Sequence, residues 1–297
     1  METETKDVVA RWHSAAALGG DLHGEAVDTL LDSLGDPHPF VRWHASKALA
    51  ETARTLQGQG PLGSVLGARR ADHILTFKEF WRRLERGMQD GNARCRAAIA
   101  DGLGLWGHPQ AIAPLVSMLQ ADDDPLVRVS AADALGRIGD RQAARPLGEA
   151  LTDESLWVRS ASAHALGQIA APESVDALED TLADAEPLVR GSAAAALGHI
   201  ATDKARKTLI QCLQNGDPAV RWYAARGLAK IGGVDSLVPL EDLLEDETVL
   251  FDRSIGEMAR SAIAAIKDRS KSPWHWLRRQ FHIIMHIVGE KRKKGRG

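Results

Sequence analysis

The stretch that decides the fold is Asp124-Pro-Leu-Val-Arg-Val-Ser-Ala-Ala-Asp-Ala-Leu-Gly-Arg-Ile138, because close copies of it follow at 157–169 and 188–200. The copies read Trp-Val-Arg-Ser-Ala-Ser-Ala-His-Ala-Leu-Gly-Gln-Ile and Leu-Val-Arg-Gly-Ser-Ala-Ala-Ala-Ala-Leu-Gly-His-Ile. A repeat of this kind is typical of a solenoid, in which each unit buries its apolar face only by stacking on its neighbours.

One arginine marks each copy and recurs through most of the chain. Successive arginines lie 31, 54, 32, 31, 31 and 31 residues apart, so the second interval holds 23 extra residues. We number the positions of each repeat from this arginine, which is position 0. The series consists of Arg11, Arg42, Arg96, Arg128, Arg159, Arg190 and Arg221.

Each repeat is predicted to be a pair of helices. Apolar or small residues at positions −1, +3, +4, +7 and +10 form the stripe of an amphipathic helix, which we call helix B. An Asp-, Asn- and Pro-rich turn precedes it, and a shorter helix A is expected before that turn. Helix A is expected at 142–151, 173–182, 204–213 and 235–244. The whole is predicted to be an all-α, right-handed α-solenoid of about eight helix pairs over residues 1–271.

The Asp-Pro-x-Val-Arg and Ala-x-Ala-Leu-Gly-x-Ile strings resemble HEAT repeats, specifically the short bacterial kind named after phycobilisome lyases. The resemblance is strong over residues 90–232 and recognisable from about 8 to 266. In that family the arginine and the turn aspartate usually form a ladder between repeats, and a ligand-binding role is the alternative. The resemblance implies this structural role for Arg42, Arg128, Arg159, Arg190 and Arg221.

Composition favours a cytoplasmic protein that is not a dedicated DNA binder. The first residues lack the apolar core of a signal peptide, and no apolar run approaches the roughly 18 residues of a membrane span. Residues 271–297 carry eight Lys or Arg and one Glu, whereas the net charge of the whole chain is −3. The predicted solenoid is therefore acidic, and a DNA-binding fold should be basic. Cys95 takes a position that valine fills in other repeats, which predicts a reduced core residue.

Two segments interrupt the period. Residues 55–75 include a Gly-rich run that predicts a loop, either beside a binding face or merely tolerated on the surface. Residues 76–88 are predicted to form a basic helix A with Phe77, Phe80, Trp81 and Leu84 on its apolar side. Residues 251–266 keep a helical stripe but shift the arginine, as expected of a terminal repeat that caps the stack.

Residues 272–297 are predicted to form a C-terminal amphipathic helix followed by a basic tail. Three interpretations stay open: the helix caps the solenoid, it docks on a partner or an anionic membrane surface, or the tail contacts nucleic acid. His282 and His286 have the spacing of a metal pair but no third ligand, so no metal site is expected. The residues expected to dock are Trp274, Trp276, Leu277, Arg278, Arg279, Phe281, Ile284, Val288, Lys291 and Arg292.

Positions +1, +2, +5 and +9 of helix B point away from the core stripe, and in HEAT solenoids helix B usually lines the concave side. These positions predict a concave face with aromatic ends and a small, charged centre. Binding and packing remain alternative roles for the tryptophans, whereas Trp106 falls in the +10 core position. The candidate binding residues are Trp12, His13, Trp43, His44, Lys47, Asp101, Asp133, Arg137, His164, His199, Trp222, Tyr223 and Arg226.

These patterns favour a non-catalytic scaffold that binds a protein partner, with no cofactor. The resemblance also suggests an alternative, a bilin lyase-like protein that handles a tetrapyrrole in its aromatic groove. A hydroxylase resembling deoxyhypusine hydroxylase is not expected, because the sequence contains no His-Glu dipeptide. Nucleic-acid recognition like that of HEAT-like DNA glycosylases is not expected from an acidic solenoid.

Overall fold

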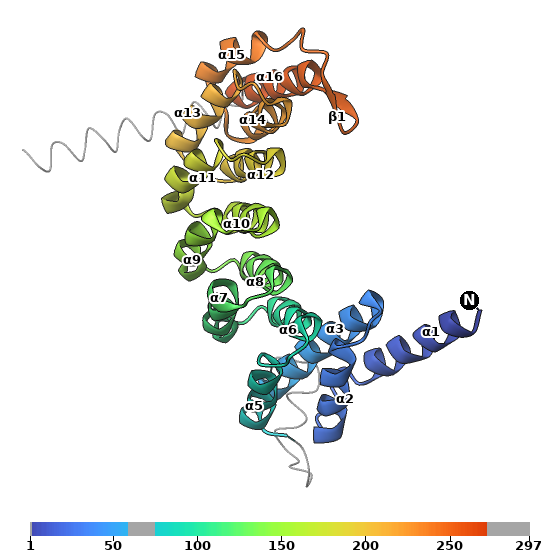
Figure 1. The fold of residues 1–297 in the computed structure, drawn as a ribbon. Helices are drawn as coiled ribbons and strands as arrows, with labels where there is room; N and C mark the ends of the chain where they lie inside the picture. The colour runs from blue at the N-terminus through green and yellow to red at the C-terminus, as the bar shows by residue number, and fades with distance from the viewer. Residues whose placement is uncertain (1, 59–74, 272–297) are drawn as a thin grey trace, which may run out of the picture. The chain divides into compact units, whose positions relative to one another are not determined.

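The computed structural model describes residues 2–58 and 75–271, and within them the chain is an all-α solenoid (Figure 1). The chain divides into two compact units, Met1–Ala196 and Leu197–Gly297, which we call unit 1 and unit 2.

Unit 1 begins with α1 (Glu2–Ala17) and continues as pairs of helices A and B. The B helices stack side by side in one layer, and the A helices form a second layer against them (Figure 1). The A helices are α2 (Gly24–Leu34), α5 (Phe77–Gly87), α7 (Ile112–Ala121), α9 (Ala144–Glu149) and α11 (Val175–Thr181). The B helices are α3 (Pro39–Leu56), α6 (Ala93–Trp106), α8 (Pro125–Ile138), α10 (Leu156–Ile169) and α12 (Pro187–Leu197).

Short 3-10 turns flank several A helices of unit 1. Three of them lead into an A helix and one follows α9. They are η1 (Pro109–Ala111), η2 (Arg141–Ala143), η3 (Ala150–Thr152) and η4 (Pro172–Ser174).

Unit 2 contains two further helix pairs and a small hairpin. Its elements are α13 (Asp203–Cys212), α14 (Pro218–Ile231), η5 (Val234–Ser236), α15 (Leu237–Glu241), β1 (Val249–Leu250), β2 (Arg253–Ser254) and α16 (Ile255–Lys271). The strands are antiparallel, with Val249 opposite Ser254. The expected helix over residues 251–266 is therefore wrong at its start: the chain turns at Phe251, where φ is 62°, and the helix begins at Ile255.

The sequence explains where the B helix α8 begins and ends. In α8 the side chain of Asp124 accepts a hydrogen bond from the Leu126 N–H at 2.9 Å, and Pro125 occupies the first turn, where its missing N–H costs nothing. The helix ends at Gly139, which has a φ of 74°, a conformation that glycine adopts without strain. The predicted stripe is the core, since Val127 and Leu135 are both fully buried.

The predicted helix A over residues 76–88 is confirmed as α5. Thr76 and Glu79 form a capping box at its start, in which each residue accepts a hydrogen bond from the other's backbone N–H. Phe80 and Leu84 are buried, and Trp106 is buried as its core position predicted. Cys95 is buried as well, and this burial raises the pKa of its thiol to about 11.

Candidate functional site

The repeated arginine is a structural link between neighbouring repeats of unit 1. Arg128 donates from Nε and Nη2 to the two carboxylate oxygens of Asp153, both at 2.9 Å. Its Nη1 donates to the backbone carbonyls of Asp122 and Asp123 at 3.0 and 3.1 Å. The planar guanidinium thus binds its own turn through one edge and the next turn through the other. We call this arrangement a rung.

The same rung recurs with little change. Arg96 holds Asp122 through two hydrogen bonds of 2.7 Å, and Arg159 holds Asp184 through bonds of 2.7 and 3.0 Å. In unit 2, Arg221 binds Asp246 at 3.0 Å. Hydrogen bonds from Arg159 lower the pKa of Asp184, so the carboxylate stays ionised. Arg128, Arg159 and Arg221 thus make the contacts between successive turns that a structural role requires.

Arg190 and Arg42 make the same contacts to backbone carbonyls as the other arginines of the series. Arg190 donates from Nη1 to the carbonyls of Asp184 and Ala185 at 2.8 and 2.9 Å. Arg42 donates from Nη1 to the carbonyls of Asp36 and Pro37 at 2.7 and 2.9 Å.

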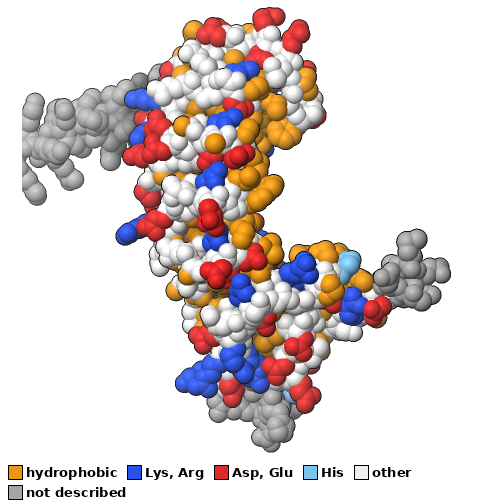
Figure 2. Space-filling model, viewed as in Figure 1, with side chains coloured by type: hydrophobic (Ala, Val, Ile, Leu, Met, Phe, Trp, Pro, Cys, Tyr) orange, Lys and Arg blue, Asp and Glu red, His pale blue; other side chains and the backbone are white. Residues whose placement is uncertain are grey.

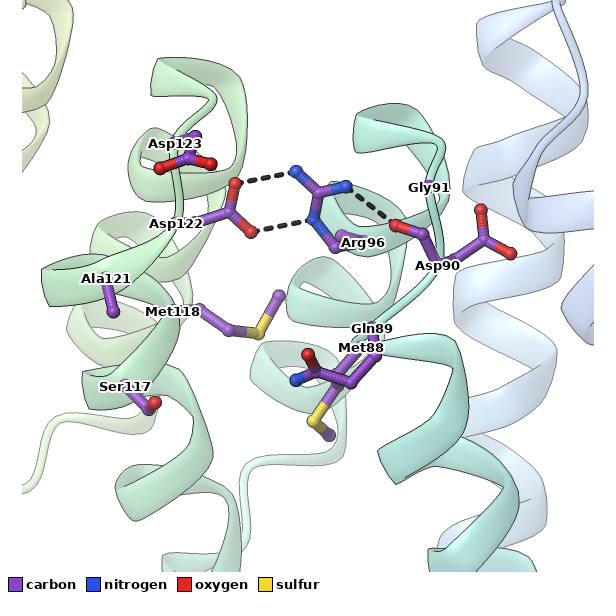
Figure 3. A pocket seen from close by; sticks show the side chains of 10 residues that line it. All are labelled: Met88, Gln89, Asp90, Gly91, Arg96, Ser117, Met118, Ala121, Asp122 and Asp123. Carbon is purple, nitrogen blue, oxygen red and sulfur yellow. Dashed lines mark hydrogen bonds and ion pairs between the residues drawn. The ribbon is translucent and has the colours of Figure 1, made fainter.

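A cavity of about 420 Å³ lies beside the rung between α6 and α7 (Figure 3). Met88 and Met118 supply its apolar side. Its basic group is Arg96, which is already held by Asp122 and by the carbonyl of Asp90. The cavity therefore offers an incoming anion no unpaired cation, and we assign it no ligand.

Aromatic side chains gather at the amino-terminal end of unit 1, as the sequence predicted. The ring of Trp12 stacks on His44 with centroids 4.7 Å apart, and Phe40 stacks on Trp43 at 6.2 Å. The Lys47 ammonium lies 5.6 Å from the centroid of Trp43. His13 meets the edge of Trp12 at 3.8 Å. Desolvation lowers the pKa of His44, and the charges of Lys47 and His13 act in the same direction, so this ring is neutral at physiological pH.

The middle of the B layer carries the predicted charges. Arg137 of α8 donates to Asp101 of α6 at 3.1 Å, and Gln168 lies 3.0 Å from His164 on α10. Burial raises the pKa of Asp101, and the charge of Arg137 opposes this rise. Burial raises the pKa of Asp133 as well. Asp101 and Asp133 therefore lie on a part of the B layer where neighbouring side chains partly shield them from solvent.

Small side chains of α6 create a groove on the B layer, which we call the B-face groove. Its volume is about 510 Å³. The floor includes Ala97 at position +1, where α3 has Trp43, and Phe40 and Leu126 stand on either side. Arg94, Asp101 and Arg42 also line it. The predicted small-residue centre therefore forms a depression between larger neighbours.

Exposed apolar side chains extend from this groove along the B layer, and four of the five were missed by the sequence reasoning. Phe40, Leu126, Trp157 and Leu188 all stand at position −2, in the first turn of helix B. Figure 2 shows hydrophobic side chains along the edge formed by α8, α10 and α12. We call the following residues, with their exposed fractions, the apolar row: Phe40 (48%), Trp43 (49%), Leu126 (47%), Trp157 (63%) and Leu188 (46%).

Comparison with known proteins identifies the repeats. The model of HEAT repeats matches residues 82–154, 112–192 and 181–260, which together cover more than half of the chain. The chain belongs to the HEAT-repeat family. None of the curated protein sequences matches it significantly.

Solved structures of HEAT-like proteins share the fold. The Escherichia coli protein YibA is 21% identical, with a TM-score of 0.53, over 85% of this chain and 95% of that chain. A chain from the structure of Kap95p binding to RanGDP is 16% identical, with a TM-score of 0.52, over 80% of this chain and 36% of its own. A chain of the CpcE–CpcF phycocyanin lyase complex from Nostoc sp. PCC7120 is 18% identical, with a TM-score of 0.41, over 81% of this chain and 94% of that chain. The similarities to YibA and to the Kap95p–RanGDP structure show the fold alone and do not identify a ligand.

In the HEAT repeats of unit 2 one expectation is wrong. Trp222 was expected on the surface, but it is only 6% exposed. Phe251, in the turn between β1 and β2, covers it with ring centroids 5.1 Å apart, and Tyr223 meets its edge at the same distance. Arg226 lies 5.5 Å from its ring. The hairpin, which the helical pattern concealed, makes Trp222 a packing residue. Further along, Lys230 lies 3.3 Å from His199.

Several other predictions fall outside the described part of the chain. All ten tail residues expected to dock lie within residues 272–297, and most of the predicted loop lies within 59–74. In the described residues no cluster of His, Cys, Asp or Glu has the geometry of a metal site. The helices over residues 2–58 and 75–271 include none with the length and apolarity that crossing a membrane requires.

Proposed function

We propose that this HEAT-repeat protein is a non-catalytic scaffold that binds a protein segment along the apolar row and the B-face groove of unit 1. The observation that carries the proposal is the apolar row itself. Five large apolar side chains, each about half exposed or more, follow one another along the B layer. Soluble proteins rarely expose so many large apolar side chains along one layer unless these contact a partner.

The extent of the row favours a protein over a small ligand. It spans the helices from α3 to α12, and neighbouring packed helices lie roughly 8–10 Å apart, so the four intervals give a length on the order of 32–40 Å. A small ligand is normally enclosed in a concave pocket that covers most of its surface. An extended segment or an amphipathic helix can contact several positions along a row of this length.

The composition of the surface also suits a protein partner. Trp43 and Trp157 stand in the row, and Arg42 and Arg94 lie beside Phe40 in the B-face groove. Tryptophan and arginine are enriched among the residues that contribute most to binding at protein interfaces. Because Trp157 is mostly exposed, a partner that covers it would gain the burial of a large apolar ring.

The tail and the tetrapyrrole alternative remain predictions. A truncation to residues 1–271 separates the tail from the apolar row. If the tail docks on the partner or on anionic vesicles, the truncation weakens that binding. A tetrapyrrole in the aromatic end of unit 1 would change its absorbance spectrum on mixing, and an unchanged spectrum would dismiss it.

The row can be tested with a matched pair of variants. The test variant carries Leu126→Ser, Trp157→Ser and Leu188→Ser. The control carries Val234→Ser and Val238→Ser, which are similarly exposed apolar residues of unit 2. A partner captured from the source cells is purified, and its affinity for each variant is measured by calorimetry. We expect at least about a tenfold loss for the test variant and no change for the control. Equal affinities for all three proteins would refute the proposal.

A further inference from the structure

Arg42 lacks the carboxylate that the other rungs contain. In the rungs of Arg96, Arg128 and Arg159, Nε and Nη2 bind an aspartate of the next turn through two hydrogen bonds. Arg42 has its two carbonyl contacts through Nη1, but among the described residues no carboxylate hydrogen-bonds to its Nε or Nη2. The rung at Arg42 is therefore half formed.

The sequence spacing between arginine and aspartate also differs at Arg42. A formed rung joins an arginine to an aspartate 25 or 26 residues later. The equivalent turn residue for Arg42 is Asp90, which follows it by 48 residues because the 23 extra residues intervene. In the structure the side chain of Asp90 accepts a hydrogen bond from the Asn92 N–H at 2.7 Å, and its carbonyl accepts one from Arg96. Its carboxylate does not reach Arg42.

The half-formed rung borders the B-face groove. Arg42 and Arg94 both line the groove, and the Arg94 side chain is exposed. The groove also contains Asp101, whose carboxylate is held by Arg137 at 3.1 Å. His38 lines the groove too, but its Nδ1 accepts a hydrogen bond from the Phe40 N–H at 3.3 Å. Two guanidinium groups thus face the groove, and its one carboxylate already has a partner.

We infer that the B-face groove binds a protein segment in which a carboxylate stands next to large apolar side chains. The carboxylate takes the place that Asp153 has beside Arg128 and completes the rung at Arg42, with Arg94 as a second contact. The apolar side chains pack against Phe40, Trp43 and Leu126. This inference rests on the proposed function, because it names the chemistry of the segment that the same surface binds.

The geometry favours a carboxylate over a cation. A planar guanidinium with two adjacent N–H donors matches the two oxygens of a carboxylate, as the formed rungs show in this molecule. A lysine or arginine of a partner would meet Arg42 and Arg94 as like charges. Charge complementarity of this kind selects between partners more strongly than it adds affinity.

The test starts from a random peptide library displayed on phage and selected on the full-length protein. Peptides that bind the Trp43→Ser, Leu126→Ser variant equally well are removed, so that the peptides retained depend on the groove. We expect the retained peptides to be enriched in Asp or Glu next to Leu, Phe or Trp. One retained peptide and its copy with Glu→Gln and Asp→Asn are then synthesised, and their affinities are measured by fluorescence anisotropy.

Two arginine variants and one control identify the contact. We expect Arg42→Gln and Arg94→Gln each to weaken the acidic peptide by about tenfold and to leave the amide peptide nearly unchanged. Arg94→Gln keeps the test decisive if Arg42→Gln is poorly folded, because the side chain of Arg94 has no hydrogen bond to lose among the described residues. Arg145→Gln is the control, since Arg145 is exposed on α9 and pairs with Glu149 at 3.0 Å.

The outcomes separate the two proposals. Groove-dependent peptides that are acidic and sensitive to Arg42 and Arg94 support the inference. Groove-dependent peptides that are neutral or basic, or that are indifferent to both arginines, overturn the inference but leave the proposed function standing. A selection that yields no groove-dependent peptide counts against the proposed function itself.

Discussion

Arg128 and Arg42 occupy the same position in their repeats, but their surroundings differ. Arg128 stands in the regular part of unit 1, where Asp153 and two backbone carbonyls take up its guanidinium. Arg42 stands before the insertion and binds only the two carbonyls of its own turn. The comparison teaches that the contacts to the arginine's own turn persist in both repeats, whereas the link to the next turn is present at Arg128 and absent at Arg42. The unused donors of Arg42 are the basis of our inference about a carboxylate ligand.

The largest expected effect on stability is at Arg128, in the regular part of unit 1. Arg128→Ala removes a buried guanidinium and leaves the largely enclosed carboxylate of Asp153 and two carbonyls without their donor, so we expect a loss of about 3 kcal/mol in the free energy of unfolding. Arg42→Ala removes only the carbonyl contacts and should cost about 1 kcal/mol. Chemical denaturation followed by circular dichroism compares the two, with Arg145→Ala as the exposed control. Equal losses at both positions would contradict the account.

Close packing between the regular repeats gives the next effect. A Cβ added to Gly104 would lie 2.8 Å from the Cα of Ala134, and this backbone atom cannot move aside. Gly104→Ala should therefore destabilise unit 1 by about 2 kcal/mol. Gly148→Ala is the matched control, since no heavy atom lies within 4 Å of its added Cβ, and helix propensity predicts a small gain there. Both are measured by thermal unfolding, and a stable Gly104→Ala protein would show that the repeats pack less tightly than described.

A smaller effect on stability is expected at Asp184, the carboxylate partner of Arg159. Because the pKa of Asp184 is lowered in the folded state, its contribution to stability is present above the unfolded pKa of about 4 and is lost as the pH falls through the folded value. Asp184→Asn should cost about 1 kcal/mol at neutral pH. The difference in the free energy of unfolding between wild type and variant should shrink as the pH falls below about 4. Urea unfolding from neutral pH to below about pH 4 tests this pH dependence. A difference in the free energy of unfolding that stays constant over this range would contradict it.

The smallest effect is expected on the apolar row. Trp157 is largely exposed, so Trp157→Ser should change the free energy of unfolding by no more than about 0.5 kcal/mol. The same change should weaken partner binding. A large loss of stability would instead make Trp157 a packing residue and remove it from the proposed interface.

The repeats and the rungs could be predicted from the sequence because they depend on a period. The stripe that contains Val127 and Leu135 is regular, and the resemblance to HEAT repeats supplied the link between arginine and aspartate. The open rung at Arg42 could not be predicted in this way. Asp90 stands at the turn position where the partner is expected, and only three-dimensional distances show whether it reaches Arg42.

The candidate site was predicted only in part. Trp43 was found because position +1 faces away from the core stripe. Phe40, Leu126, Trp157 and Leu188 were missed, although the signal was present: the variable residue directly before the valine at position −1 is large and apolar in each of these repeats. Trp222 was misjudged because the hairpin that covers it has only two residues in each strand, too few for a recognisable pattern.

Hydroxyl-radical footprinting of the protein with and without its bound partner tests the central claim most directly, because it reports the solvent exposure of individual side chains. The account predicts that oxidation of Phe40, Trp43 and Trp157 falls on binding. It predicts that oxidation of Phe251, which is 73% exposed on the hairpin of unit 2, stays unchanged. Unchanged oxidation of the apolar row in a saturated complex would contradict the account and place the interface elsewhere.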